Sequence, residues 1–354
     1  MYSRDEEPRR SPSADPGAAR ILVVISYHTD TSHYPRSGRR EDRRDTYWTN
    51  IATNAATLRH VHGPGPEILV FAGDEPASTP ATVLREAAVE IRHVDFARRP
   101  PEDFYHRYLG SLYVLDVMAA LVDEVADDDV LLFVDPDVVW MAPIDPLVAD
   151  VREGGIVAYH LDVPDTVPMC RLTRREQGEV LREITGHGPP ADGPAYPHFG
   201  GELYGMLGAE LRSVLPELER LWAATMARYM QGLTHFNVEE HLMNGVLWQR
   251  GEQAGRANRH IARIITSPPP RGSRERARPG LVAWHLPIEK DRGLMRIFRR
   301  ISSGQPLPQP GPAYERWVSH RVGVRPTPGR WLTDRARKLK WATVDRRDRP
   351  TYGI

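Results

Sequence analysis

Residues 130–140 of this 354-residue chain are Val130-Leu131-Leu132-Phe133-Val134-Asp135-Pro136-Asp137-Val138-Val139-Trp140. The first five are all apolar, which is typical of a strand buried on both faces of a parallel sheet. Pro136 has no backbone N–H, so we expect pairing to stop there and Asp135 and Asp137 to project from the carboxyl end of the strand. Ligands of open α/β sheets bind at that end. Two carboxylates on a rigid support predict a site for Mn²⁺ or Mg²⁺ that is bound together with a diphosphate.

A second Asp-x-Asp occurs in the same region, at residues 127–129. It precedes the strand and follows Asp123 and Glu124, so we interpret it as a solvated loop. Taken alone, residues 135–137 could also be an ordinary acidic turn. Their place after the buried strand is what favours the metal site.

The composition is that of a globular protein, with 40% hydrophobic and 27% charged residues. Lys+Arg 47 balances Asp+Glu 47, so no overall positive field indicates a nucleic-acid partner. No apolar run has the length of a membrane-spanning helix, and residues 1–20 lack the apolar core of a signal peptide. A single cysteine, Cys170, excludes an intrachain disulfide and favours a cytoplasmic location.

Strand and helix patterns alternate through the first part of the chain. We expect strands at 21–25, 67–71, 91–94 and 130–134, separated by helices at 47–61, 81–90 and 105–125. This order predicts an α/β fold with a doubly wound, mostly parallel sheet, in which residues 21–140 form the nucleotide-binding half. Ser26 and Tyr27 follow the first strand, where a nucleotide base could stack. Neither Gly-x-Gly-x-x-Gly nor a P-loop motif is present, which argues against a dinucleotide dehydrogenase and a P-loop NTPase.

Residues 141–300 are expected to form the acceptor half of the same domain. The pattern predicts a helix at 143–151, a strand at 155–159, an irregular segment at 160–195 and a helix at 207–230. Gly200 and Gly201 would precede that last helix in a turn. Two adjacent glycines let the backbone approach a ligand closely, although a plain turn is an equal alternative.

Two later segments add polar side chains. Asn237 could cap a helix, with Glu240 closing a capping box, which is a purely structural role for that carboxylate. Alternatively, Glu239 and Glu240 could serve the site. His285, in the segment 281–290 that is expected to be a strand running into a loop, could bind metal or could be a packed loop residue.

The two ends of the chain differ from the domain between them. Residues 1–20 are polar and proline-rich and are expected to be disordered. We interpret the arginine-rich residues 29–46 as a solvated loop rather than a lid over phosphate. Residues 301–354 are expected to form a Pro/Gly-rich linker and a basic extension. That extension suits a peripheral contact with an anionic membrane surface, or a solvated helix.

Four motifs occur in an order that resembles the GT-A-fold glycosyltransferases. They are Asp135-Pro136-Asp137, Phe199-Gly200-Gly201, Glu239-Glu240-His241-Leu242-Met243-Asn244, and Trp284-His285 with Lys290. The chain is most similar to two retaining groups, the blood-group-type α-galactosyl/N-acetylgalactosaminyl transferases and the glycogenin/galactosyltransferase (family eight) group. The resemblance spans residues 21–300 in the order of elements, while matching residues are confined to the motifs.

The resemblance implies roles for individual residues. Asp135 and Asp137 would bind Mn²⁺ and the donor diphosphate, His285 would be a third metal ligand, and Lys290 would contact phosphate. The family-eight glycine after the histidine is Ile288 here, and Lys290 comes one position early, which departs from the pattern.

The two groups disagree about the sugar-facing residue. The blood-group register places Glu239 there, while the family-eight register, anchored on Asn244, places Glu240 there. We therefore keep both carboxylates as catalytic candidates. The remaining candidates, for contact with the donor or acceptor sugar, are His198, Gly200, Gly201 and His241.

The expected activity is metal-dependent transfer of a sugar from a nucleotide-diphosphate donor, with UDP favoured, to an acceptor hydroxyl. The acceptor would be a glycan, a small molecule or a lipid-linked molecule, and retention at the anomeric carbon is implied by the resemblance. A sugar-nucleotide nucleotidyltransferase is one alternative, but residues 26–30 lack the glycine-rich loop of that class. A non-catalytic binding protein on a transferase fold is another.

Overall fold

The computed structural model describes residues 19–28, 40–105, 108–162, 164–190, 198–250, 255–266, 280–325 and 328–333. Residues 1–18 of the expected disordered tail (1–20), residues 29–39 of the arginine-rich loop and the basic extension from residue 334 lie outside the described residues. The membrane contact expected of that extension therefore stays a prediction. None of the described helices combines the length and the apolar character needed to cross a bilayer.

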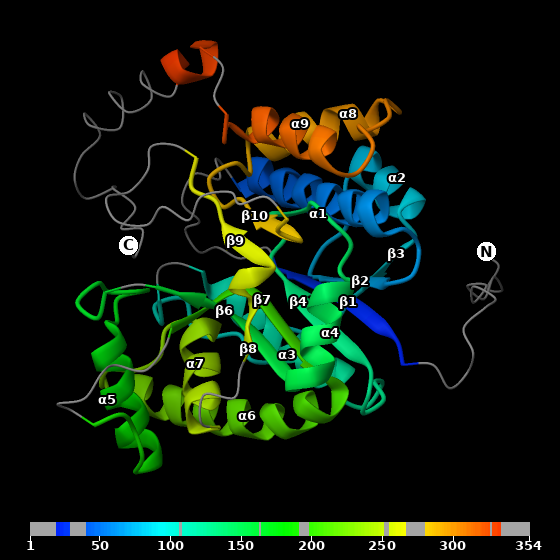
Figure 1. Cartoon of the computed structure of the whole chain (residues 1–354). Coiled ribbons are helices and arrows are strands. Elements are labelled where there is room, and N and C mark those ends of the chain that lie inside the picture. Colours follow the sequence, from blue (N-terminus) through cyan, green and yellow to red (C-terminus); the bar gives the residue numbers. More distant parts are fainter. Residues whose placement is uncertain are drawn as a thin grey trace, which may run out of the picture.

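A seven-stranded sheet forms the centre of the protein, in the order β3-β2-β1-β4-β7-β6-β8 (Figure 1). Its strands are β1 (Ile21–Tyr27), β2 (Glu67–Ala72), β3 (Val89–Arg92), β4 (Val130–Val134), β6 (Ile156–Leu161), β7 (His198–Leu207) and β8 (Gly255–Arg256). Strand β7 runs antiparallel to β4 and β6, and the other neighbouring pairs are parallel. The prediction of a mostly parallel α/β sheet is confirmed.

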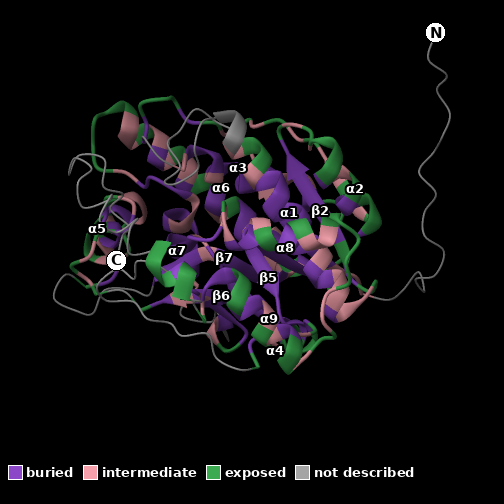
Figure 2. Ribbon diagram, turned by 90° about the horizontal axis from the view of Figure 1, so that it is seen from above, coloured by how far each residue is buried: buried purple, intermediate pink, exposed green. Residues whose placement is uncertain are grey.

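Helices cover both faces of this sheet. One face carries α1 (Arg40–His62), α2 (Ser78–Glu86), α4 (Asp145–Gly154), α8 (Gly293–Ser302) and α9 (Pro312–Val322). The other carries the 3₁₀ turn η1 (Leu109–Leu112), α3 (Tyr113–Leu121), α5 (Arg174–Thr185), α6 (Gly208–Met230) and α7 (Glu239–Gln249). Figure 2 shows the buried strands between helices whose outer faces are exposed.

The position of strand β4 accounts for its apolar run, because its side chains alternate between two hydrophobic cores. Val130, Leu132 and Val134 belong to the core under α1, and Leu131 and Phe133 to the core under α3 and α6. All five are buried. A strand with a core on each face has no solvent side on which a polar residue could be placed.

A second, three-stranded sheet has the order β5-β10-β9. It is formed by β5 (Val138–Trp140), β9 (Ile261–Arg263) and β10 (Ala283–His285). Because β5 begins directly after Asp137, the acidic pair forms the corner at which the chain leaves one sheet for the other.

Several local expectations were wrong. The helix expected at 105–125 is a 3₁₀ turn followed by the short helix α3. Phe199-Gly200-Gly201 lies within strand β7 rather than in a turn, because Phe199 and Gly200 pair with β6. The irregular segment 160–195 contains α5, which starts at a capping box between Thr173 and Glu176. That Thr-x-x-Glu signature was readable in the sequence.

The capping box expected at Asn237 and Glu240 is also wrong. Val238 is the residue that precedes α7, and no side chain caps the helix. The Asn237 amide instead donates to the carbonyl of Cys170 at 2.8 Å. Further along, the segment expected to be a linker contains α9, whose Tyr314, Val318 and Val322 are buried in the core under α1.

Candidate active site

Strand pairing brings distant residues to the acidic corner. β5 and β10 are antiparallel and pair Val138 with His285, which places the imidazole beside Asp137. On the other side, β4 pairs with β7, and the Asp135 N–H donates to the carbonyl of Glu202 at 3.3 Å. The carboxyl end of β4 therefore gathers side chains from four strands.

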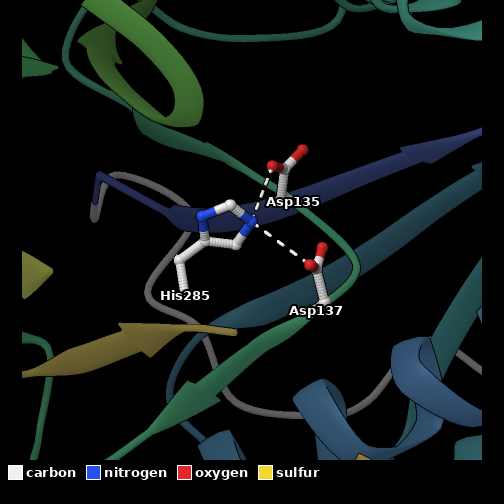
Figure 3. A group of neighbouring side chains, drawn as sticks. All are labelled: Asp135, Asp137 and His285. Atoms are coloured by element: carbon white, nitrogen blue, oxygen red, sulfur yellow. Dashed lines mark ion pairs between the residues drawn. The ribbon is translucent and has the colours of Figure 1, made fainter. Parts of the chain in front are cut away.

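Asp135, Asp137 and His285 form a compact cluster (Figure 3). His285 Nε2 lies 3.1 Å from Asp135 Oδ2 and 3.2 Å from Asp137 Oδ2. One ligand atom from each residue lies within 4.8 Å of the others. Asp137 is fully buried, while the Asp135 side chain is 40% exposed and faces the adjoining cavity.

The donor set fits a divalent cation such as Mn²⁺. Two carboxylates and one imidazole are ligands that such ions accept. Both carboxylate oxygens of Asp137 are buried, and the only side-chain donors described near them are His285 Nε2 and Lys290 Nζ, 3.2 and 3.3 Å from Oδ2, so the carboxylate has room to bind a cation. His285 Nδ1 faces Glu202 Oε1 at 3.3 Å, and a carboxylate behind a metal-binding histidine orients its ring and increases its basicity.

Protonation of His285 opposes metal binding. Burial lowers the pKa of His285, but the charges and hydrogen bonds of Asp137, Asp135 and Glu202 outweigh burial and raise this pKa well above its usual value. Because a metal needs the neutral imidazole, binding would release this proton.

Lys290 extends the charged end of the site. Its Nζ lies 3.3 Å from Asp137 Oδ2 and donates to the Tyr47 hydroxyl at 3.1 Å. The Tyr47 ring stacks on Tyr27, with 4.9 Å between ring centroids and an interplanar angle of 16°. Tyr27 thus lies on the same side of the cavity as the ammonium group, and Ser26 lines the same cavity, while their contact with a nucleotide stays a prediction.

Glu240 is held at both carboxylate oxygens. Oε1 accepts the Gly201 N–H at 2.9 Å, and Oε2 lies 3.3 Å from His198 Nε2. Arg263 Nη2 is 3.9 Å from Oε1. Although burial alone raises the pKa of Glu240, the hydrogen bond from His198, the charge of Arg263 and the hydrogen bond from the Gly201 N–H outweigh burial and lower it. Glu240 is therefore an oriented carboxylate anion.

Glu239, its neighbour, has a different environment. Its Oε2 is buried without a hydrogen-bond partner. Burial and the negative charge of Glu240 raise the pKa of Glu239 to about 8. A Cβ at Gly201 would lie 2.8 Å from Glu239 Oε1, so this glycine lets β7 pass close to the carboxyl group. Adjacent carboxyl groups with separated pKa values are typical of sites in which the two have different tasks.

Arg263 connects the two parts of the site. It forms an ion pair and a hydrogen bond with Glu202, which also faces His285, and it approaches Glu240 from the same side. Glu202 is fully buried, and burial raises its pKa, but the charge of Arg263 and the hydrogen bond of His285 outweigh burial and lower the pKa. The Arg263 guanidinium thus lies between the Asp135–Asp137–His285 cluster and the glutamate pair.

These residues surround one cavity of about 520 Å³. Most of the predicted site residues line it: Ser26, Tyr27, Asp135, Gly201, Glu239, Glu240, His285 and Lys290. Asp137 lies just behind the wall. His198 and His241 are fully buried and do not line the cavity, and neither does Gly200. The expected contact of a sugar with His198, His241 and Gly200 is therefore not supported by their positions.

Four contributors were missed in the sequence: Tyr47, Asn54, Glu202 and Arg263. Glu202 was the easiest to find, because it follows the Gly-Gly pair directly. Asn54 accepts from the Trp140 indole at 2.7 Å and donates to the Asp135 carbonyl at 3.1 Å, so it pins the acidic corner to α1. No local pattern marks Arg263 among the many arginines of this chain, since only the strand register places it.

Searched by sequence, the chain matches no family model and no curated protein. Solved structures that it resembles include an active-site mutant of LgtC, at 16% identity and a TM-score of 0.47 over 80% of this chain and 95% of that chain. The galactosyltransferase LgtC in complex with donor and acceptor sugar analogs has 17% identity and a TM-score of 0.42, over 88% of this chain and 99% of that chain. Mouse xyloside xylosyltransferase 1 in its apo form has 10% identity and a TM-score of 0.41, over 70% of this chain and 88% of that chain. The chain is thus similar, at a distance, to glycosyltransferases of known structure.

Proposed function

We propose that this chain is a metal-dependent glycosyltransferase that moves a sugar from a nucleoside-diphosphate donor, with UDP favoured, to an acceptor hydroxyl. The observation that carries the proposal is the shared cavity. Asp135 and His285, with Asp137 behind them, lie in the same hollow as the Lys290 ammonium and two glutamates. A cation site beside an ammonium suits a diphosphate, and paired carboxyl groups suit a cationic reacting centre.

The charged end would bind the diphosphate. Asp135, Asp137 and His285 would hold a divalent cation, which when bound neutralises negative charge on the departing diphosphate. Lys290 would contact a phosphate oxygen as a compact point charge. Its contact with Tyr47 keeps the ammonium next to the stacked tyrosine pair, where a base and ribose could lie.

The two glutamates would divide the work at the sugar. Glu240 is an oriented anion, so we assign it to the positive charge that develops at the anomeric carbon. Glu239 keeps a proton up to about pH 8 and so offers an O–H to a sugar hydroxyl. Retention at the anomeric carbon rests only on the family resemblance, and it is part of the proposal in that sense.

We expect a nucleoside diphosphate to stabilise the protein only when Mn²⁺ is present. Thermal unfolding would be measured with UDP, GDP, CDP and ADP, each with and without the metal. A ligand at 100 times its Kd should add about 2.7 kcal/mol to the free energy of unfolding. Donor hydrolysis with the matching sugar conjugates would then identify the sugar.

Two outcomes of that screen, run also with the matching nucleoside triphosphates, would contradict the proposal. Stabilisation by nucleoside triphosphates in place of diphosphates would favour a nucleotidyltransferase. No response to any nucleotide would favour a binding protein on a transferase fold.

We expect Glu240→Gln to lower turnover by about 100- to 1000-fold, the usual cost of losing one charge-stabilising group. Glu239→Gln should stay within about tenfold, because a neutral amide resembles the protonated acid. Steady-state rates of donor hydrolysis and transfer would be compared at pH 7. Equal and mild effects at both positions would remove the pair from the chemistry.

A further inference from the structure

A buried chain of hydrogen bonds runs behind Glu240. Two backbone groups determine which of its atoms donate and which accept. The Phe199 N–H donates to Asn244 Oδ1 at 2.6 Å, which orients the Asn244 amide. Its Nδ2 then faces His198 Nδ1 at 3.1 Å and Gln177 Oε1 at 3.5 Å. The Gln177 amide is itself oriented, because its Nε2 donates to the Leu172 carbonyl at 3.2 Å.

This direction determines where His198 carries its proton. An Asn244 amide that must accept from a backbone N–H has only N–H groups left for its other contacts. His198 Nδ1 therefore accepts, and a neutral imidazole that accepts at Nδ1 carries its proton on Nε2. That nitrogen faces Glu240 Oε2 at 3.3 Å. The result is an N–H aimed at the carboxylate.

This chain of hydrogen bonds is shielded from solvent. The side chains of Gln177, His198 and Asn244 have exposures of 0%. A reversed Asn244 amide would set its Nδ2 against the Phe199 N–H, two donors at hydrogen-bond distance, and would leave His198 Nδ1 facing a carbonyl oxygen. An unsatisfied buried donor costs about 1–3 kcal/mol, so a single arrangement is favoured.

We propose that His198 is a positioning residue that Asn244 holds as the neutral Nε2–H tautomer, so that it donates a permanent hydrogen bond to Glu240. The Gly201 N–H donates to the other oxygen, so each oxygen of the Glu240 carboxylate has a hydrogen-bond donor that is held by strand β7. The reacting-centre role of Glu240 rests on the proposed function. The tautomer does not, because it follows from the hydrogen bonds alone.

The tautomer is measured directly by ¹⁵N NMR of protein with labelled histidine. His198→Gln identifies the His198 signals by their loss. At pH 7 we expect an unprotonated Nδ1 and a protonated Nε2. A proton on Nδ1 would overturn the inference, whether or not the protein transfers sugar. Asn244→Asp, whose carboxylate can only accept, should place a proton on Nδ1.

The positioning role is tested by turnover. His198→Leu removes the N–H and should lower kcat by about 10- to 100-fold, the range for residues that orient a reacting group, with little change in donor KM. His198→Gln keeps an amide N–H in reach of Glu240 and should restore most of the lost rate. His60→Leu, on α1 and outside the cavity lining, is the control for loss of a partly buried histidine.

Equal losses in His198→Leu and His198→Gln would overturn the positioning role and indicate a packing role instead. Wild-type protein that shows no metal-dependent nucleotide binding would contradict the proposed function, and the NMR result would then decide the inference by itself.

Discussion

Asp137→Asn should lower the affinity for Mn²⁺ by at least about 100-fold and abolish metal-dependent nucleotide binding. Replacing groups that only support a metal ligand already costs about 10- to 100-fold, and Asp137 would itself be a ligand. The amide keeps the size of the carboxylate, so the buried corner between β4 and β5 should stay filled. What is lost is the negative charge that His285 and Lys290 share.

The chain contains a matched control in its other Asp-x-Asp. Asp128→Asn removes one exposed carboxylate on the amino-terminal side of the same strand. It should leave Mn²⁺ affinity, measured by isothermal titration, unchanged. If Asp137→Asn and Asp128→Asn behave alike, the cation does not bind at the acidic corner.

Arg330→Met should destabilise the protein by about 3–5 kcal/mol, the usual cost of removing one partner from a buried ion pair. Arg330 Nη2 lies 2.5 Å from Glu289 Oε1, and the two side chains are 2% and 0% exposed. Glu289 directly precedes Lys290, and it also accepts from Thr266 and from the Gly293 N–H. The variant would leave this carboxylate buried without its ion-pair partner.

Urea unfolding measures this loss, and Arg85→Met, on the exposed side of α2, should change stability by less than about 0.5 kcal/mol. Adding Glu289→Gln to Arg330→Met removes the unpaired charge and should recover part of the loss. We also expect weaker metal-dependent nucleotide binding in Arg330→Met, because the segment that holds Lys290 loses its anchor. A cost below about 1 kcal/mol would show that the pair does not hold this segment.

The elements that the sequence predicted best are those whose signal is local. The apolar run at β4 has a core on each side, so no polar residue interrupts it, and Pro136 ends the strand where the pairing stops. Helix α6 and the parallel strands β1 and β2 were likewise near their expected positions. In each case, neighbours in the chain carry enough information to determine the element.

Predictions failed where tertiary contacts override the local pattern. Phe199-Gly200-Gly201 has the composition of a turn, yet it lies in β7 because Phe199 and Gly200 pair with strand β6. Glu240 fits a capping box by spacing, but its carboxylate binds the Gly201 N–H on another element. In both places a short-range motif predicted one structure, and a contact with a residue distant in sequence determined another.

The sequence by itself determined that a buried strand ends in two carboxylates at the ligand-binding edge of an α/β sheet. Local periodicity and the proline between the carboxylates suffice for that. Only the tertiary structure decided that His285 meets Asp137, because this contact depends on the register between β5 and β10. It also decided how Glu239 and Glu240 differ. Their pKa values depend on which N–H groups and charges surround each carboxyl group, and strands and helices distant in sequence supply these.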